Sequence, residues 1–222
     1  KHNFYVYTGV AQTLPCTVRA FVFDNLNNKQ GQQVTAFANT AYNEVGWFYP
    51  STDSLTTDKM VVYNYVEQAW SISDLARDAW DDAAAASDLP IAVKSTDSVG
   101  YIFNHETGFD DDGSAITAFI ETADFDIADG DSFAFVRRLL PDAAFVGTSS
   151  SPSLTYSLKS RNNTDGTIAT ESTVDVSPTT DFAISNVRAR ARQMRIRVES
   201  TDLENGWRLG DVRLDVRQDG RR

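Results

Sequence analysis

The chain has little of the chemistry on which metal centres and nucleophilic enzymes depend. It contains one cysteine, Cys16, and two histidines among 222 residues. A single cysteine excludes an intrachain disulfide and any zinc site built from several thiolates. We therefore expect Cys16 to be a small buried apolar residue, and we expect no cofactor.

Long apolar runs are also missing. No stretch approaches the roughly 18 apolar residues that a membrane-spanning helix needs, and residues 1–20 lack the basic and then apolar pattern of a signal peptide. The sequence therefore predicts no membrane span. Because it begins at Lys1 and opens directly on the strand-like run 4–7, we expect either processing or an unseen upstream part of a longer polypeptide.

Positive charge is scarce and unevenly placed. The 20 Lys and Arg residues face 31 Asp and Glu residues, which gives a net charge of −11. From Arg188 to the end, ten arginines face six acidic residues, a local balance of +4, so the remainder carries −15. An acidic body disfavours nonspecific adhesion to nucleic acid, whereas the basic end can face an anionic partner.

Short runs of β-branched and aromatic residues, separated by Gly, Asn, Asp, Ser and Thr, are typical of strands. They occupy residues 4–7, 34–38, 45–49, 60–66, 99–103 and 115–121. The sequence therefore predicts an all-β protein with little helix. One short helix is expected near 17–26, where Val18, Phe21 and Val22 recur at helical spacing.

The most linker-like stretch is the serine-rich segment 148–153. It predicts two regions, with propeller-like antiparallel sheets in residues 1–147 and an arginine-bearing β-sandwich-like region in residues 154–222.

The segment 188–198 carries a register anomaly. Its arginines occupy even positions up to Arg192 and odd positions from Arg195, while Met194 begins an apolar series on the even positions. Since side chains of a strand alternate between two faces, the arginine face must change near Gln193. This predicts a bulge there, or a strand that leaves one covered layer for another.

The densest acidic cluster is His105–Gly113, in which Asp110 and Asp112 are weak candidates for Ca²⁺ ligands. Their spacing does not match the alternating carboxylates of a calcium loop. A hairpin turn closed by Gly113 explains the same run without a metal, and we favour it.

The sequence contains none of the usual serine-hydrolase, zinc-protease or nucleotide-loop motifs. A glycosidase pair such as Asp53 and Asp58 has no fixed spacing, so a glycoside hydrolase is a second alternative to a non-enzymatic function. Aromatic residues, including Trp47, Trp70 and Trp80, could instead form a carbohydrate-stacking platform. Core packing is the favoured interpretation for them, and their solvent exposure distinguishes the two.

Several motifs resemble those of tail hub proteins of tailed bacteriophages, which include tail nozzle and packaged-DNA stabilisation proteins. The similar stretches are Phe4–Gly9, Leu14–Arg19, Asn43–Ser51, Val62–Tyr65, His105–Gly113, Phe119–Thr122, Arg190–Met194, Trp207–Gly210 and Arg213–Arg217. The resemblance covers nearly the whole chain, as the C-terminal portion of longer relatives.

This resemblance implies a structural virion protein that forms a tail hub or nozzle ring, assembled in the bacterial host cytoplasm. The implied partners are further copies in a ring, with a hexamer expected, the portal or adaptor and other tail proteins, and phage DNA passing through the lumen. A receptor- or glycan-binding β module of the virion is the first alternative.

Arginine-rich strands suit contacts between neighbouring subunits, because a guanidinium binds carboxylates in a bidentate manner. The candidates for this role are Arg188, Arg190, Arg192, Arg195, Arg197, Arg208, Arg213 and Arg217. Contacts with phosphates, or a solvated face paired with local acids, remain alternatives for the same residues.

Overall fold

The computed structural model describes residues 2–82, 88–96, 98–127, 130–163, 165–178 and 184–220. The chain forms two compact units, Lys1–Thr107 (unit 1) and Gly108–Arg222 (unit 2). The paired strands are antiparallel, and no sheet in the described part closes into a barrel. The expected all-β class with little helix is confirmed. Among the described residues, no helix is long and apolar enough to cross a bilayer.

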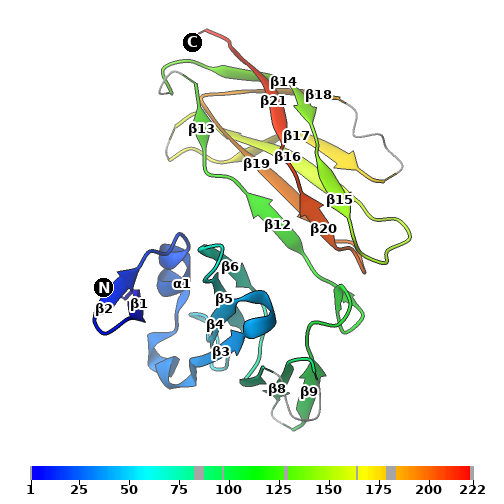
Figure 1. The fold of residues 1–222 in the computed structure, drawn as a ribbon. Helices are drawn as coiled ribbons and strands as arrows, with labels where there is room; N and C mark the ends of the chain where they lie inside the picture. The colour runs from blue at the N-terminus through cyan, green and yellow to red at the C-terminus, as the bar shows by residue number, and fades with distance from the viewer. Residues whose placement is uncertain are drawn as a thin grey trace. The chain divides into compact units, whose positions relative to one another are not determined.

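Unit 1 consists of a hairpin, a short helix and two small sheets (Figure 1). The hairpin joins β1 (Phe4–Tyr7) and β2 (Ala11–Leu14), and α1 (Arg19–Asn25) and the 3-10 turn η1 (Asn28–Gln33) follow it. The four-stranded sheet has the order β3 (Thr35–Asn39), β4 (Glu44–Tyr49), β5 (Lys59–Asn64) and β6 (Ala69–Ser73), with the 3-10 turn η2 (Thr40–Tyr42) between β3 and β4. The three-stranded sheet is β7 (Ala79–Asp81), β8 (Ile91–Ser95) and β9 (Gly100–Asn104).

The core of unit 1 is small and aromatic. The helix expected near 17–26 is α1, and its one buried residue, Val22, packs with Tyr49 and Val61. The ring of Phe4 lies 4.9 Å from that of Trp47 and 4.6 Å from that of Trp70. These contacts attach the hairpin to the four-stranded sheet.

Unit 2 begins with the short hairpin β10 (Asp110–Asp111) and β11 (Ser114–Ala115). Its larger sheet, the β19 sheet, has the order β12 (Ala118–Glu121), β19 (Gln193–Ser200), β16 (Leu154–Arg161) and β17 (Ala169–Val176), and β13 (Phe125–Asp126) also pairs with β19. The β14 sheet has the order β18 (Ser185–Ala191), β14 (Ala134–Leu140) and β21 (Arg213–Gln218). A third pair is formed by β15 (Ala143–Phe145) and β20 (Trp207–Leu209).

The β19 and β14 sheets share one apolar core, as the two sheets of a sandwich do. The β14 sheet contributes Val136 and Leu139, both fully buried, and the β19 sheet contributes Tyr156 and Met194. Because both sheets turn one face to this core, the alternate side chains of each strand form two outer faces.

The chain changes sheets at Arg192, which separates β18 from β19 (Figure 1). Ala191 is the last inward residue of the β14 sheet and Met194 is the first of the β19 sheet, so two residues separate successive inward positions instead of one. The predicted change of arginine face near Gln193 is therefore confirmed, and its cause is the passage between layers.

The expected division at 148–153 is wrong. Strands before this segment pair with strands after it: β12 with β19, β14 with β18 and β21, and β15 with β20. The segment is a loop of unit 2, in which Ser153 donates to Asp202 through its backbone and its hydroxyl, both at 2.7 Å. The polar composition of a loop does not show whether the strands before and after it pair with each other. The boundary between the two units lies at 107/108.

We expect Leu139→Ala to lower the free energy of unfolding of unit 2 by about 2–5 kcal/mol, because it leaves a cavity in the shared core. Leu203→Ala is the matched control, since Leu203 is 46% exposed. Its effect should stay within about 0.5 kcal/mol. Urea unfolding followed by tryptophan fluorescence measures both, and equal losses would contradict the shared core.

Candidate functional site

The eight candidate arginines do not form one surface. Arg195 and Arg197 lie on the outer face of the β19 sheet, whereas Arg188 and Arg190 of β18, and Arg213 and Arg217 of β21, lie on the outer face of the β14 sheet. Arg192 lies at the crossing between the sheets, and Arg208 lies on β20. The switch of sheets therefore sends the two ends of one arginine-rich segment to opposite sides of the sandwich.

On the β19 sheet, the arginines belong to an ion-pair network centred on Glu121. This carboxylate accepts from Lys159 at 2.8 Å and from Arg195 at 2.9 Å, and Arg197 lies 3.4 Å from it. Burial raises the pKa of Glu121, but the hydrogen bonds and charges of Lys159 and Arg195 outweigh burial and lower the pKa to about 2. The carboxylate is thus ionised at neutral pH.

A second carboxylate, Asp124, extends the network. It accepts from Arg195 at 2.7 Å and pairs with Arg161. The hydrogen bond from Arg195 is the main reason that the pKa of Asp124 is lowered, against the opposing effect of burial. The two carboxylates in turn raise the pKa of Arg195 above its ordinary value.

Arg197 is also engaged within its own sheet. It donates to Glu199 at 2.8 Å, and its guanidinium lies 3.8 Å from the centre of the Phe119 ring. For Arg195 and Arg197, pairing with local acids describes the structure better than the expected role in subunit contacts. Their guanidinium donors already have partners in the same sheet.

The outer face of the β14 sheet is different. We call it the arginine face, and it consists of Arg137, Arg138, Arg188, Arg190, Arg213 and Arg217 with Phe135, Asp215 and the adjoining Asp219. The register of β14 shifts between Val136 and Arg138 against both neighbouring strands. Since Val136 and Leu139 are both fully buried, Arg137 and Arg138 point outward together at this bulge.

Acids do not balance the arginine face. Asp219 pairs with Arg190 at 2.5 Å, but Asp215 lies 3.6 Å from Arg137 and 3.7 Å from Arg217, beyond hydrogen-bonding distance. Six arginines and two aspartates leave a surplus of +4.

Arg192 is held at the crossing by backbone and ring contacts. Its guanidinium donates to the carbonyl oxygens of Gly130 at 2.9 Å and Asp131 at 3.2 Å, and it lies 4.9 Å from the centre of the Phe133 ring. Arg190 lies 4.0 Å from the same ring. Arg192 thus stabilises the passage between the sheets.

The acidic run at 110–112 forms the favoured hairpin. Asp111 pairs with Ser114 across a two-residue loop, in which Asp112 and Gly113 have φ angles of 52° and 81°. Positive φ at both positions is typical of a tight type I′ hairpin turn. No group of three potential metal ligands is found within the described residues.

The three tryptophans singled out as an alternative platform are half-buried. The Trp47 and Trp70 rings stack 6.2 Å apart, and Trp70 donates its indole N–H to the Pro15 carbonyl oxygen at 2.8 Å. Trp80 packs 4.9 Å from Phe37. This is the partial burial expected of side chains that pack elements together.

Asp53 and Asp58 lie on one loop, but their surroundings differ. Asp53 is exposed, whereas Asp58 accepts from the backbone N–H of Ser51 at 2.7 Å and from its hydroxyl at 2.6 Å. Asp58 therefore closes the loop. His105 accepts from Arg77 at 2.9 Å and packs 4.6 Å from the Trp80 ring.

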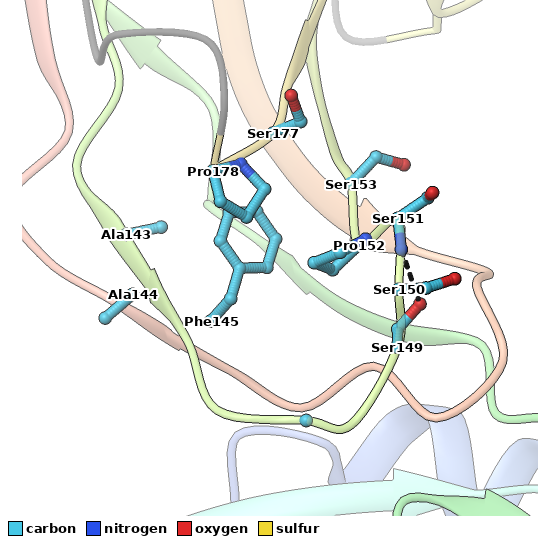
Figure 2. A pocket seen from close by; sticks show the side chains of 11 residues that line it. Ala143, Ala144, Phe145, Ser149, Ser150, Ser151, Pro152, Ser153, Ser177 and Pro178 are labelled. Carbon is cyan, nitrogen blue, oxygen red and sulfur yellow. Dashed lines mark hydrogen bonds between the residues drawn. The ribbon is translucent and has the colours of Figure 1, made fainter.

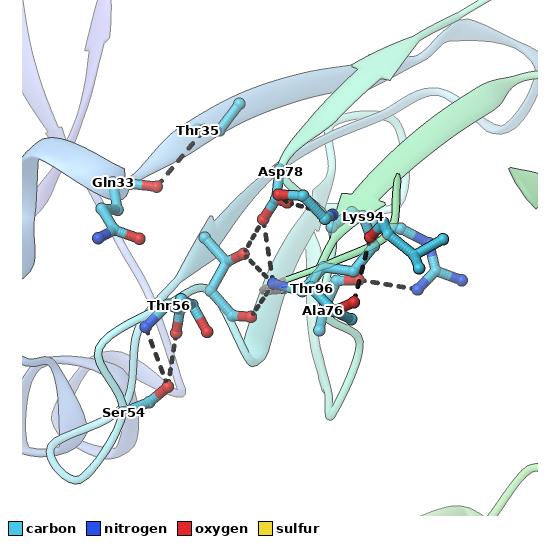
Figure 3. Close-up of polar contacts among 12 residues, drawn as sticks. Gln33, Thr35, Ser54, Thr56, Ala76, Asp78, Lys94 and Thr96 are labelled. Carbon is cyan, nitrogen blue, oxygen red and sulfur yellow. Dashed lines mark hydrogen bonds and ion pairs between the residues drawn. The ribbon is translucent and has the colours of Figure 1, made fainter. Parts of the chain in front are cut away.

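Among the described residues of unit 1, Asp78 is the carboxylate that accepts the most hydrogen bonds (Figure 3). It accepts from Thr57 at 2.9 Å, from Lys94 at 3.0 Å, and from the backbone and hydroxyl of Ser95, both at 2.7 Å. Burial raises its pKa, but these bonds outweigh burial and hold the pKa well below its usual range. Asp78 borders a small groove of about 240 Å³, where it acts as a structural link.

A larger groove, of about 710 Å³, lies in unit 2 beside the serine-rich loop. Figure 2 shows Phe145 and Pro178 on one side of it and Ser149–Ser153 on the other. None of the described residues that line it has a titratable side chain, and they offer serine hydroxyls and backbone groups for hydrogen bonding.

The sequence interpretation missed the residues that distinguish the two faces. Glu121, Asp124 and Lys159 were not candidates, because they come from segments far from the arginine segment in sequence. Arg137 and Arg138 were missed as well, although two adjacent arginines inside an apolar strand are a local sign of a bulge.

No protein-family model matches the chain, and no curated protein matches it either. Its function is therefore inferred from the geometry of the described residues and from the motifs of the sequence.

We expect Glu121→Gln to lower the free energy of unfolding at pH 7 by roughly 1–3 kcal/mol, since it weakens charged hydrogen bonds to Lys159 and Arg195. Because the folded pKa of Glu121 lies below its ordinary value of 4.5, this contribution is present above pH 4.5 and is lost as the pH falls toward 2. The difference between wild type and variant should therefore shrink in acid.

Urea unfolding at several pH values between 7 and 3 measures this difference. The exposed Asp211→Asn is a matched control of the same charge change, with an expected effect within about 0.5 kcal/mol. A wild-type advantage that does not change with pH would contradict the role of an ionised Glu121.

Proposed function

We propose that the chain is a structural, non-enzymatic virion protein of a tailed bacteriophage. In this proposal it forms a tail hub or nozzle ring that retains and conducts the genome, and the two sheets of unit 1 correspond to blades of a propeller. The resemblance of the motifs to tail hub proteins suggests the class. The strand edges of unit 1 carry the proposal of self-assembly.

Two strands of unit 1 have unprotected apolar edges. In β1, Tyr5 is 61% exposed and Tyr7 is 77% exposed, and in β9, Tyr101 is 49% exposed and Ile102 is 75% exposed. Each strand pairs on one side only within the described part of the chain. Neither strand contains a charged residue or a proline, which are the usual means of preventing edge pairing.

The two edges suit contacts between copies. Pairing of β1 of one copy with β9 of the next would join two different surfaces, which is a heterologous contact. Such contacts produce a ring when the rotation between neighbours closes, and an open filament when it does not. A ring is the closed outcome, and the main-chain hydrogen bonds of a shared sheet would hold it together.

The charge of the chain suits a conduit. Unit 1 has six basic and twelve acidic residues, a net charge of −6, and unit 2 has fourteen and nineteen, a net charge of −5. Both units are acidic in total, and like charge keeps DNA from adhering to the acidic parts of a wall that it passes.

The alternatives have less support. A glycan-binding module would use exposed aromatic platforms, but Trp47, Trp70 and Trp80 are half-buried against neighbouring rings and backbone. For a glycoside hydrolase, Asp58 would need a free carboxylate, and both of its oxygens are bound by Ser51.

Sedimentation velocity of the purified chain tests self-assembly. We expect a species several times heavier than the 24.5 kDa monomer at tens of micromolar. Ile102→Lys should weaken association at least tenfold, because a lysine on an edge strand opposes pairing. Leu55→Lys is the control, since Leu55 is 70% exposed but lies outside the strands, and it should leave the mass unchanged.

A wild-type chain that stays monomeric at this concentration would contradict the proposal. Equal dissociation by both lysine variants would contradict the role of the β9 edge. Electron microscopy of the assembled species separates a ring from a filament.

A further inference from the structure

Three guanidinium groups of the arginine face have no partner among the described residues. The side chains of Arg138, Arg188 and Arg213 make no hydrogen bond or ion pair with any residue in the described part of the chain. Arg188 and Arg213 are exposed, and Arg138 is half-buried beside the bulge. The contrast with the β19 sheet is direct, because there Glu121 and Asp124 bind Arg195 at 2.9 and 2.7 Å, and Glu199 binds Arg197 at 2.8 Å.

The arrangement of these groups is extended. They lie on three neighbouring strands, which are about 4.8 Å apart, and outward residues recur about every 6.7 Å along each strand. Phe135 lies among them, opposite Arg190 on one side and Arg217 on the other. The result is a sheet face with rows of cations, and such a face fits a linear polyanion better than a single small anion.

The chemistry of the face favours phosphate. All six of its cations are arginines, whose planar guanidinium binds phosphate oxygens in a bidentate manner. A protein partner would have to place carboxylates at matching positions. A nucleic-acid backbone presents a phosphate at every nucleotide and therefore meets these rows in any register.

Electrostatics would restrict such binding to this face. The arginine face has a surplus of +4, so the rest of the chain carries −15. A polyanion is repelled by the acidic remainder and attracted by one side of one sheet.

We propose that the arginine face of the β14 sheet binds the phosphate backbone of nucleic acid without sequence preference. Binding uses Arg138, Arg188 and Arg213 as free donors and Arg137 and Arg217 as donors that exchange Asp215 for phosphate. It depends on this face alone and does not require ring assembly.

Fluorescence anisotropy with a labelled random-sequence DNA duplex tests the proposal. The full chain is titrated at salt concentrations from 50 to 200 mM. We expect binding that weakens steeply with salt, since each phosphate neutralised adds about 0.9 to the slope of log K against log salt. The triple variant Arg138→Ala, Arg188→Ala, Arg213→Ala should bind at least tenfold more weakly at 50 mM salt, with a slope smaller by about 2–3.

Arg188→Glu and Arg208→Glu form a matched pair. Both residues are exposed arginines on strands of unit 2, but Arg208 lies on β20, outside the arginine face. Arg188→Glu should abolish most of the binding, whereas Arg208→Glu should change it less than twofold. These substitutions leave the core untouched, so we expect each variant to fold. Circular dichroism checks that each variant is folded.

Absence of binding at 50 mM salt overturns the proposal, as does an equal loss in the two glutamate variants. Sedimentation without DNA provides a further test. If the triple variant lowers the mass of the assembled species, the face is a contact between copies, and the nucleic-acid proposal is overturned. A chain that binds DNA through this face but stays monomeric supports the nucleic-acid proposal and contradicts only the proposal of ring assembly.

Discussion

The passage of the chain between sheets at Arg192 determines the environment of every arginine in the segment 188–197. Both halves of the segment pack apolar side chains into one core, from Val187 to Ala191 on one side and from Met194 to Val198 on the other. The arginines must then lie on opposite outer faces of the sandwich. Arginines that are close together in the sequence therefore have different neighbours, because the two outer faces differ in the number and position of their acidic residues.

The β19 sheet and the β14 sheet illustrate two uses of arginine. On the β19 sheet, Glu121 and Asp124 bind Arg195 and Glu199 binds Arg197, so these charges stabilise the sheet and offer little to a partner. On the β14 sheet the acids are too few to pair with the arginines. A partner that covers this face removes water from the arginines, and it must itself supply the anions that offset the cost of desolvation. Ion pairing within the chain thus separates a structural surface from a binding surface.

Much of the fold could be predicted from the sequence, because its signals are local. Strand composition, the short helix near Val22, the hairpin at Asp112 and the change of arginine face near Gln193 all follow from periodicity or turn chemistry. The boundary could not be predicted, since it depends on pairing between strands far apart in sequence, such as β12 with β19. The acidic partners of Arg195 and Arg197 could not be predicted for the same reason. The bulge at Arg137 and Arg138 could have been predicted, because two adjacent arginines inside an apolar strand are a local pattern.

The bulge in β14 separates the charge of the surface from the packing of the interior. Val136 and Leu139 remain buried while two residues, instead of one, project between them. Without Arg137 the strand would alternate regularly, with Val136 inward, Arg138 outward and Leu139 inward. A one-residue deletion at this point would therefore remove a cation and leave the core intact. Evolution could adjust the charge of this surface through the length of a single strand, without altering the fold beneath it.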